Sequence, residues 1–338
     1  MPPAIEVGMR YLGHLPRHDP VYGYLYDRIF ARKLGVYPRQ GFRVFAASAA
    51  DNVYVYEDRQ HGRRVLGKYF KRSGRAKSTP NAAHEYQVLK NLQAAGLDRG
   101  QHRVVRPLGL TLDFADALFE EFECGEPLYR VWTRTRPGTD DRDMMHALSD
   151  LAYLLCRLHN RTAGDETVDF RGEFDYFDKI VARLWRRRRA RQDQIDALYS
   201  ARHRWEQDSQ MYADRRVRLH GDATPANFIV GGTHRLTAID LERSHRGDRA
   251  YDVGMVAGEL RHWALRQFGD GARAEPYIGH FLWEYARHFP DQSRTFRAVT
   301  DRLPFYMGVT LLRIARNSYL SDGYASALVH DALACLRR

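Results

Sequence analysis

The order of apolar and polar residues predicts a β-rich region in the first third of the chain. Short β-prone segments, bounded by polar loops and turns, predict strands over residues 42–47, 53–56 and 65–70. Because the connections between them are short, we expect these strands to pair in order as an antiparallel meander. An apolar pattern of helical period precedes them, over residues 21–34.

The next segments complete this region. Residues 81–95 have a helical period that stops at Gly96, and residues 104–112 and 117–122 are two further strand candidates. The pattern then changes near residue 125, so the sequence predicts a boundary there.

The rest of the chain is predicted to be mainly helical. Residues 128–215 and 255–338 are rich in helical patterns, and residues 144–159 have the clearest amphipathic one. A strand, a turn and a second strand lie between these blocks, over residues 217–242. The expected organisation is an N-terminal extension over residues 1–40, a β-rich lobe over 41–124 and a helical lobe over 125–338.

Composition narrows the class of protein. The 338 residues suit about two domains, and 53 basic against 42 acidic residues leave a net charge of +11. That excess favours anionic partners but says nothing about the fold. No apolar run approaches the roughly 18 residues of a spanning helix, and the N-terminal segment has no signal-peptide core. The three cysteines form no C-x-x-C pair, so we expect no disulfide framework and a cytoplasmic location.

The strongest chemical signal is a set of polar residues around the predicted hairpin. His220, Asp222 and Asn227 lie in a turn-forming stretch before its first strand, and Asp240 and Glu242 end its second strand. Because a hairpin brings its two ends together, Asp222, Asn227 and Asp240 are expected around one point. Three oxygen ligands suit a hard cation such as Mg²⁺. In the alternative interpretation, the Asp and Asn side chains only cap backbone groups of the turn.

The pattern His-Gly-Asp-x-x-x-x-Asn, followed by Ile-Asp-x-Glu, resembles the catalytic core of the aminoglycoside phosphotransferase and choline kinase family, distant relatives of the protein kinases. The resemblance covers about residues 42–330, with its specificity in 219–252. It implies an α+β, bilobal, protein-kinase-like fold. A small antiparallel-β N-lobe with one helix and a larger, mainly helical C-lobe would hold ATP and Mg²⁺ in the cleft between them.

The resemblance also implies roles for single residues. Asp222 would act on the proton of the substrate hydroxyl, and Asn227 and Asp240 would hold Mg²⁺. Glu242 is a further expected metal contact. Asp252 matches an aspartate of the family that supports the catalytic loop through hydrogen bonds.

The same reaction needs a cation on the nucleotide phosphates. Lys68, one of only six lysines, lies in the third predicted strand, where the kinase arrangement has a lysine. Glu85 on the following predicted helix matches its usual partner. The alternative is a surface ion pair of little energetic consequence.

Two further segments are expected to contact ATP. The loop from Ser48 to Asn52 resembles the polar phosphate loops of small-molecule kinases, although it has no glycine, and its backbone N–H groups can contact phosphate. The strand over residues 117–122 leads into an expected hinge, where backbone groups from Glu121 to Glu123 would hold the adenine.

Departures from the protein kinases favour a small-molecule acceptor. Thr224 stands where protein kinases have a lysine, and the dozen residues from Asp240 to Asp252 are too few for a phosphorylation-controlled loop. We expect transfer of the γ-phosphoryl group of ATP to a hydroxyl of an amino sugar, sugar, glycolipid or alcohol. Two alternatives stay open: a Ser/Thr protein kinase-like enzyme of the same fold, and a catalytically silent nucleotide-binding regulator.

One strong charge block lies in the helical lobe, at Arg186–Arg191. A solvated helix face is the simplest interpretation, and a patch that contacts phosphate or a membrane surface is the alternative. No nucleic-acid partner is expected, because Trp185 is the only aromatic residue beside these arginines.

Overall fold

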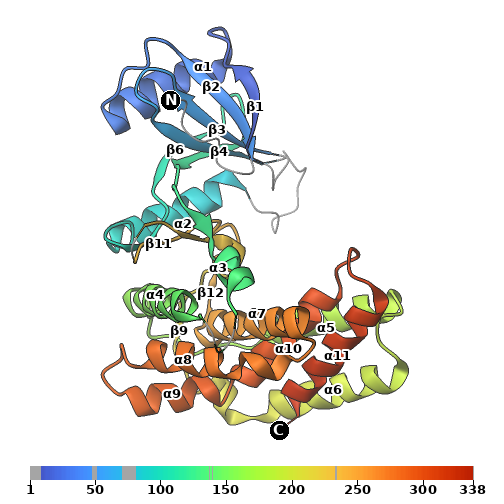
Figure 1. Cartoon of the computed structure of the whole chain (residues 1–338). Coiled ribbons are helices and arrows are strands. Elements are labelled where there is room, and N and C mark those ends of the chain that lie inside the picture. Colours follow the sequence, from blue (N-terminus) through green and yellow to red (C-terminus); the bar gives the residue numbers. More distant parts are fainter. Residues whose placement is uncertain are drawn as a thin grey trace. The chain divides into compact units, whose positions relative to one another are not determined.

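The computed structural model describes residues 9–47, 52–70, 81–136, 138, 140–232 and 234–337. The chain divides into two compact units (Figure 1). The first unit comprises Met1–Cys124 together with Ile239–Arg243, and the second comprises Gly125–Ala238 and Ser244–Arg338. The short segment that carries Asp240 and Glu242 is therefore part of the first unit, although it lies far along the sequence.

An antiparallel sheet forms most of the first unit. Its strands are β1 (Met9–His14), β2 (Phe42–Ala47), β3 (Val53–Asp58), β4 (Arg64–Tyr69), β6 (Pro107–Thr111) and β7 (Ala117–Glu121), in the order β1-β2-β3-β4-β7-β6. The expected meander of β2, β3 and β4 is confirmed. The sequence did not predict β1, because this edge strand is largely exposed and its residues need not alternate. The single strand expected over residues 104–112 is instead two strands, β5 (His102–Val104) and β6.

Helices cover this sheet and complete its core. They are α1 (Pro20–Gly23), the π-helix η1 (Tyr24–Leu34) and α2 (Ala82–Ala94). The helix predicted over residues 21–34 is confirmed; it ends at Gly35, whose φ of 65° lies in the left-handed region. Leu25, Ile29 and Phe30 of η1 are fully buried against the sheet, and the Phe30 ring lies 4.9 Å from that of Phe42. This apolar packing anchors the N-terminal segment.

The second unit is mainly helical. Its elements are β8 (Glu126–Pro127), α3 (Leu128–Arg134), α4 (Arg142–Arg161), α5 (Arg171–Arg186), α6 (Gln192–Gln207), η2 (Ser209–Tyr212), β9 (Arg216–Arg218), η3 (Pro225–Asn227), β10 (Phe228–Val230), β11 (Leu236–Ala238), β12 (Arg246–Asp248), α7 (Ala250–Phe268), η4 (Gly271–Ala274), α8 (Glu275–Ala286), α9 (Gln292–Thr300), α10 (Leu303–Ala315) and α11 (Asp322–Leu336). The predicted hairpin is confirmed, since β10 pairs with β11 in antiparallel register. A second ladder joins β9 to β12. Together the two ladders position the loop between β9 and η3, which carries Asp222.

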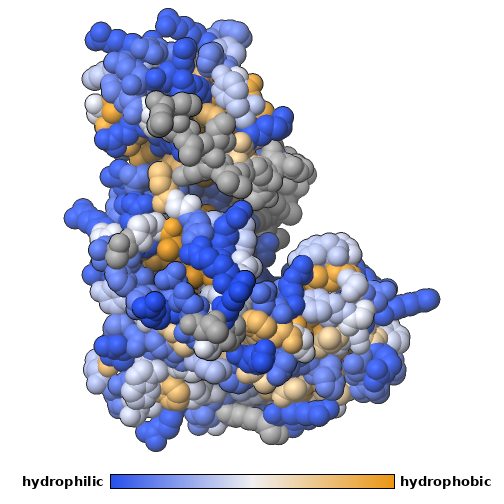
Figure 2. Space-filling view, in the orientation of Figure 1, coloured by the Kyte–Doolittle hydropathy of each residue, from blue (hydrophilic) through white to orange (hydrophobic). Residues whose placement is uncertain are grey.

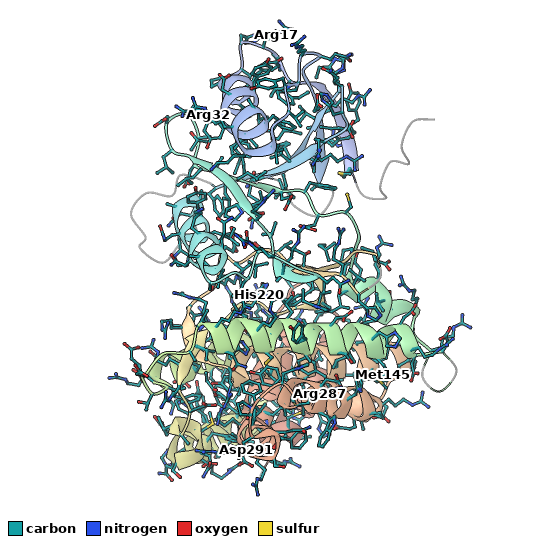
Figure 3. All side chains as sticks on the ribbon, turned by 90° about the vertical axis from the view of Figure 1, so that its left-hand side faces the viewer. Arg17, Arg32, Met145, His220, Arg287 and Asp291 are labelled. Atoms are coloured by element: carbon teal, nitrogen blue, oxygen red, sulfur yellow. The ribbon has the colours of Figure 1, made fainter. Side chains whose placement is uncertain are left out.

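Aromatic and aliphatic side chains fill the core of the second unit. A cluster with fully buried Phe177 and Phe305 joins α5, α6, α10 and α11. The amphipathic helix α4 runs across the unit, with Met145 near one end (Figure 3), and packs against α8. The face of this unit in Figure 2 is mostly hydrophilic, with scattered apolar patches. None of the helices in the described ranges combines the length and the apolar character needed to cross a membrane.

Candidate functional site

Carboxylates surround the side chain of Lys68 in the first unit. Lys68 lies on β4, between β3 and β7, and its side chain is only 13% exposed. Its Nζ donates hydrogen bonds to both carboxylate oxygens of Glu85, at 2.8 and 2.9 Å. It also donates to Oδ1 of Asp240 at 2.7 Å, across 172 residues of sequence. The structure therefore brings together three of the predicted site residues.

The charges of this cluster stabilise one another. Burial opposes the charge on Lys68, but the carboxylates of Glu120, Glu85 and Asp240 outweigh burial and raise the pKa of the ammonium. Burial also raises the pKa of Glu85, against the effect of Lys68. A permanent cation at this position can neutralise an anionic ligand.

Glu85 also positions the segment that carries Asp240. Besides its bonds to Lys68, its Oε1 accepts a hydrogen bond from the backbone N–H of Leu241 at 2.9 Å. Asp240 has a φ of 61°, a left-handed conformation that costs energy for a residue with a side chain. The fully buried carboxylate of Glu85 helps to hold this strained segment in place.

The same segment gathers a set of oxygen donors. Carboxylate oxygens of Glu85, Asp240 and Glu242 all lie within 4.8 Å of one another. Mg²⁺ prefers oxygen ligands and usually takes only one or two protein carboxylates, so the donor chemistry fits that ion. The side chain of Asp240 is 35% exposed, whereas that of its partner Lys68 is 13% exposed. The carboxylate of Asp240 is therefore accessible to an ion from solvent.

Glu120 is a member of this cluster that sequence analysis missed. It lies on β7, where it is buried, and its Oε1 has no hydrogen-bond partner among the described residues. Burial raises the pKa of its carboxyl group to about 8, although Lys68 opposes the shift. The only signal in the sequence is an acidic residue at the end of an apolar strand, which usually marks the surface.

The remaining predicted nucleotide contacts have mixed outcomes. Ser48 lies outside the described residues. Asn52 is described, and its backbone carbonyl accepts a hydrogen bond from the N–H of Tyr69 at 2.9 Å. The side chains of Glu121 and Glu123 form ion pairs with Arg106 and Arg103. Their carboxylates are therefore engaged within the protein, and any contact with a base involves backbone atoms.

In the second unit, Asp252 anchors the loop that carries Asp222. This fully buried carboxylate accepts hydrogen bonds from the backbone N–H groups of His220, at 2.6 Å, and Gly221, at 3.0 Å. His159 Nε2 lies 3.1 Å from its Oδ2. Burial opposes ionisation, but these hydrogen bonds and the His159 charge outweigh it and lower the pKa of Asp252. The predicted supporting role of Asp252 is confirmed.

The two histidines of this region are structural. His159 is buried, and its Nδ1 forms a hydrogen bond with the hydroxyl of Tyr285 at 2.8 Å. His220 is also buried, with its ring against Phe228. Neither side chain is exposed to contact a substrate.

Asp222 itself has a partner that the sequence did not predict. Arg313 Nη1 on α10 donates to Oδ1 of Asp222 at 2.6 Å, and its Nη2 donates to Glu259 at 3.2 Å. Asn227 lies close by, because its Nδ2 donates to the backbone carbonyl of Asp222 at 2.9 Å. Arg313 is 91 residues from Asp222 and belongs to no recognisable motif, so local patterns could not find it.

Within the arginine block, Arg189 has a different environment from the one expected. Arg189 is only 9% exposed and donates to the backbone carbonyls of Ala315, Asn317 and Leu320 at 2.7–2.9 Å. These carbonyls lie at and beyond the end of α10, where helices leave acceptors unsatisfied. The expectation of a solvated face is therefore wrong for Arg189, although the neighbouring Arg188 is exposed.

Several solved structures share this fold. The streptomycin–ATP–APH(2")-IIa ternary complex has a TM-score of 0.54 and 13% identity, covering 95% of this chain and 97% of that chain. Plasmodium vivax ethanolamine kinase has a TM-score of 0.55 and 14% identity, covering 86% and 81%. Amicoumacin kinase hAmiN in complex with AMP-PNP, Ca²⁺ and Ami has a TM-score of 0.55 and 15% identity, covering 87% of each chain.

These likenesses confirm the expected α+β fold, with an antiparallel sheet followed by a mainly helical part. No protein with a curated description matches the chain in sequence. The model of the phosphotransferase enzyme family, in contrast, matches residues 42–289, which include Lys68, Asp222 and Asp240. The chain therefore belongs to the phosphotransferase enzyme family, which confirms the resemblance drawn from its motifs and the expectation of a kinase-type enzyme.

Proposed function

We propose that this protein transfers the γ-phosphoryl group of ATP to a hydroxyl group of a small molecule. The observation that carries the proposal is the contact of Lys68 with Glu85 and Asp240, at 2.7–2.9 Å. A buried ammonium that is held charged beside oxygen donors is what binding of a nucleotide triphosphate requires. Membership of the phosphotransferase family supports the same reaction.

At the nucleotide end, Lys68 neutralises phosphate oxygens and Glu85 keeps the ammonium in position. Asp240, Glu242 and Asn227 are the proposed ligands of Mg²⁺, which when bound would offset the negative charge of the phosphates. The backbone near Glu121–Glu123 and the loop ending at Asn52 are proposed to contact the rest of ATP.

At the acceptor end, Asp222 takes the proton of the attacking hydroxyl. The acceptor oxygen forms a bond to the γ-phosphorus, while the bond from this phosphorus to the bridging oxygen breaks and its electron pair leaves with ADP. The loop around Asp222 is held by Asp252 through backbone hydrogen bonds, so the carboxylate needs little reorganisation during the reaction.

Local charge favours a sugar, glycolipid or alcohol over a polycation as the acceptor. Arg313 already pairs with both Asp222 and Glu259, so a cationic substrate would compete with a buried guanidinium for these carboxylates. A neutral polyhydroxyl compound has no such competition, because it can use hydrogen bonds.

An ATP-consumption screen tests the proposal, with amino sugars, aminoglycosides, simple alcohols and sugar phosphates as acceptors. With the best acceptor, Asp222→Asn is expected to lower transfer by about 10²- to 10⁴-fold, the usual contribution of a general base. Lys68→Ala should weaken productive use of ATP. The control is Asp196→Asn, at an exposed position on α6. Wild-type transfer by Asp222→Asn, or transfer to protein serine or threonine only, would contradict the proposal.

A further inference from the structure

A largely buried arginine contacts the proposed catalytic base in the second unit. The side chain of Arg313 is 13% exposed, and it lies between Asp222, which is 18% exposed, and Glu259, which is 13% exposed. Removing three such charged groups from water is costly unless they compensate one another. The arrangement therefore needs a reason beyond a surface ion pair.

The contact engages only one oxygen of the Asp222 carboxylate. Arg313 Nη1 binds Oδ1 at 2.6 Å, while Oδ2 has no hydrogen-bond partner in the part of the chain that the structure describes. The backbone carbonyl of Asp222 is held separately by Asn227. A carboxylate that is fixed through one oxygen presents the other oxygen in a defined direction.

A second carboxylate fixes the guanidinium in turn. Glu259 Oε1 accepts a hydrogen bond from Arg313 Nη2 at 3.2 Å, and His262 Nδ1 lies 3.7 Å from the other oxygen of Glu259. Burial opposes the charge on Arg313, but the charges of Asp222 and Glu259 outweigh it and raise the pKa of the guanidinium. Arg313 is thus a fixed cation between two anions, and it cannot supply or accept the proton of the reaction.

We propose that Arg313 is a positioning residue for phosphoryl transfer, which holds Oδ1 of Asp222 so that Oδ2 is left to take the proton of the acceptor hydroxyl. Glu259 keeps Arg313 in place. The inference rests on the proposed function of Asp222. The covalent changes remain those of the transfer itself: the proton moves to Oδ2, the acceptor oxygen bonds to phosphorus, and ADP leaves with the electron pair.

The test compares two largely buried arginines that each bridge two carboxylates. Arg261 on α7 has a side chain that is 15% exposed and also bridges two carboxylates, those of Asp331 and Glu275. Arg313→Gln and Arg261→Gln are both expected to lower the thermal midpoint. Only Arg313→Gln should lower kcat, by up to about 100-fold, which is the scale of a misplaced catalytic group. The KM for ATP should stay within about twofold, because Arg313 contacts residues at the acceptor end of the proposed site.

Three further variants make the test decisive. Arg313→Lys should recover part of the lost kcat, and Glu259→Gln should lower kcat less than Arg313→Gln does. In an Asp222→Asn background, Arg313→Gln should have no further effect on transfer, because it acts only through that carboxylate. If Arg313→Gln does not fold, the Arg313→Lys and Glu259→Gln variants carry the comparison.

The two proposals fail in different ways. If Asp222→Asn lowers transfer but Arg313→Gln behaves like Arg261→Gln, the inference on Arg313 is wrong and the proposed function stands. The inference would also be overturned if the double variant lost transfer activity by the product of the two single losses, those of Asp222→Asn and Arg313→Gln. If Asp222→Asn leaves transfer unchanged, the proposed role of Asp222 is itself wrong.

Discussion

Buried charge at Lys68 in the first unit and at Asp252 and Arg189 in the second unit is compensated in different ways. In the first unit, the ammonium of Lys68 is hydrogen-bonded to the carboxylates of Glu85 and Asp240, so ionised side chains balance one another. In the second, the carboxylate of Asp252 accepts backbone N–H groups, and the guanidinium of Arg189 donates to backbone carbonyls. Backbone N–H and C=O groups do not titrate between pH 5 and pH 9, whereas the charge of a side-chain cluster responds to pH and to added ions.

This difference corresponds to the two proposed tasks. The first unit has several carboxylates around one lysine, and such an excess of negative charge favours a further cation, in keeping with the proposed Mg²⁺. In the second unit, the proposed catalytic loop must keep one geometry, and its backbone hydrogen bonds to Asp252 do not depend on a ligand.

The largest expected effect comes from breaking the backbone compensation at Asp252. Asp252→Asn replaces one acceptor oxygen by an NH₂ donor. This donor would face the backbone N–H groups of the loop or His159 and could not accept their hydrogen bonds. We expect a loss of about 3–5 kcal/mol in the free energy of unfolding, as for other broken buried pairs. Urea denaturation measures it, with Asp196→Asn as the exposed control. A loss below about 1 kcal/mol would show that the backbone groups do not depend on the carboxylate.

A smaller effect is expected from the charge cluster of the first unit, and it depends on pH. Because burial raises the pKa of Glu120 from its ordinary 4.5 to about 8, folding favours the protonated form. Its contribution to stability is full below about pH 4.5 and is lost as pH rises through about 8. Glu120→Gln removes this loss. We therefore expect the advantage of the variant over the wild type to grow by about 3 kcal/mol between pH 5 and pH 8.

The check is the free energy of unfolding of both proteins between pH 5 and pH 9. Curves that stay parallel over this range would contradict the shift at Glu120. A variant that loses stability relative to the wild type at pH 8 would show that the charged carboxylate is needed there.

The smallest expected effect is on stability, and it comes from replacing the buried Arg189, in comparison with the exposed Arg188 beside it. Arg189→Gln removes charged hydrogen bonds to three carbonyls and should cost about 1.5 kcal/mol, whereas Arg188→Gln at an exposed site should cost less than about 0.5 kcal/mol. Since backbone carbonyls do not titrate, the cost at Arg189 should be the same at pH 6 and pH 9. Thermal or urea unfolding of both variants measures it. Equal costs would mean that the buried contacts of Arg189 contribute nothing.

Much of the fold could be predicted because its signals are local. The strand meander, the helix over residues 21–34 and the hairpin of β10 and β11 follow from short-range periodicity and turn residues. The pairing of Lys68 with Glu85 followed from a motif that specifies the element carrying each residue. Strand β1 was missed because an exposed edge strand needs no alternation.

By itself, the sequence determined the succession of strands and helices, the family and the identity of the residues expected to do the chemistry, because spacing and motifs encode these locally. Only the tertiary structure decided which distant charges meet: Glu120 beside Lys68, Arg313 on Asp222, and Arg189 at the end of α10. The physical reason is that electrostatic partnership depends on distance and burial in three dimensions, and neither can be read from residues 91 or 126 positions apart.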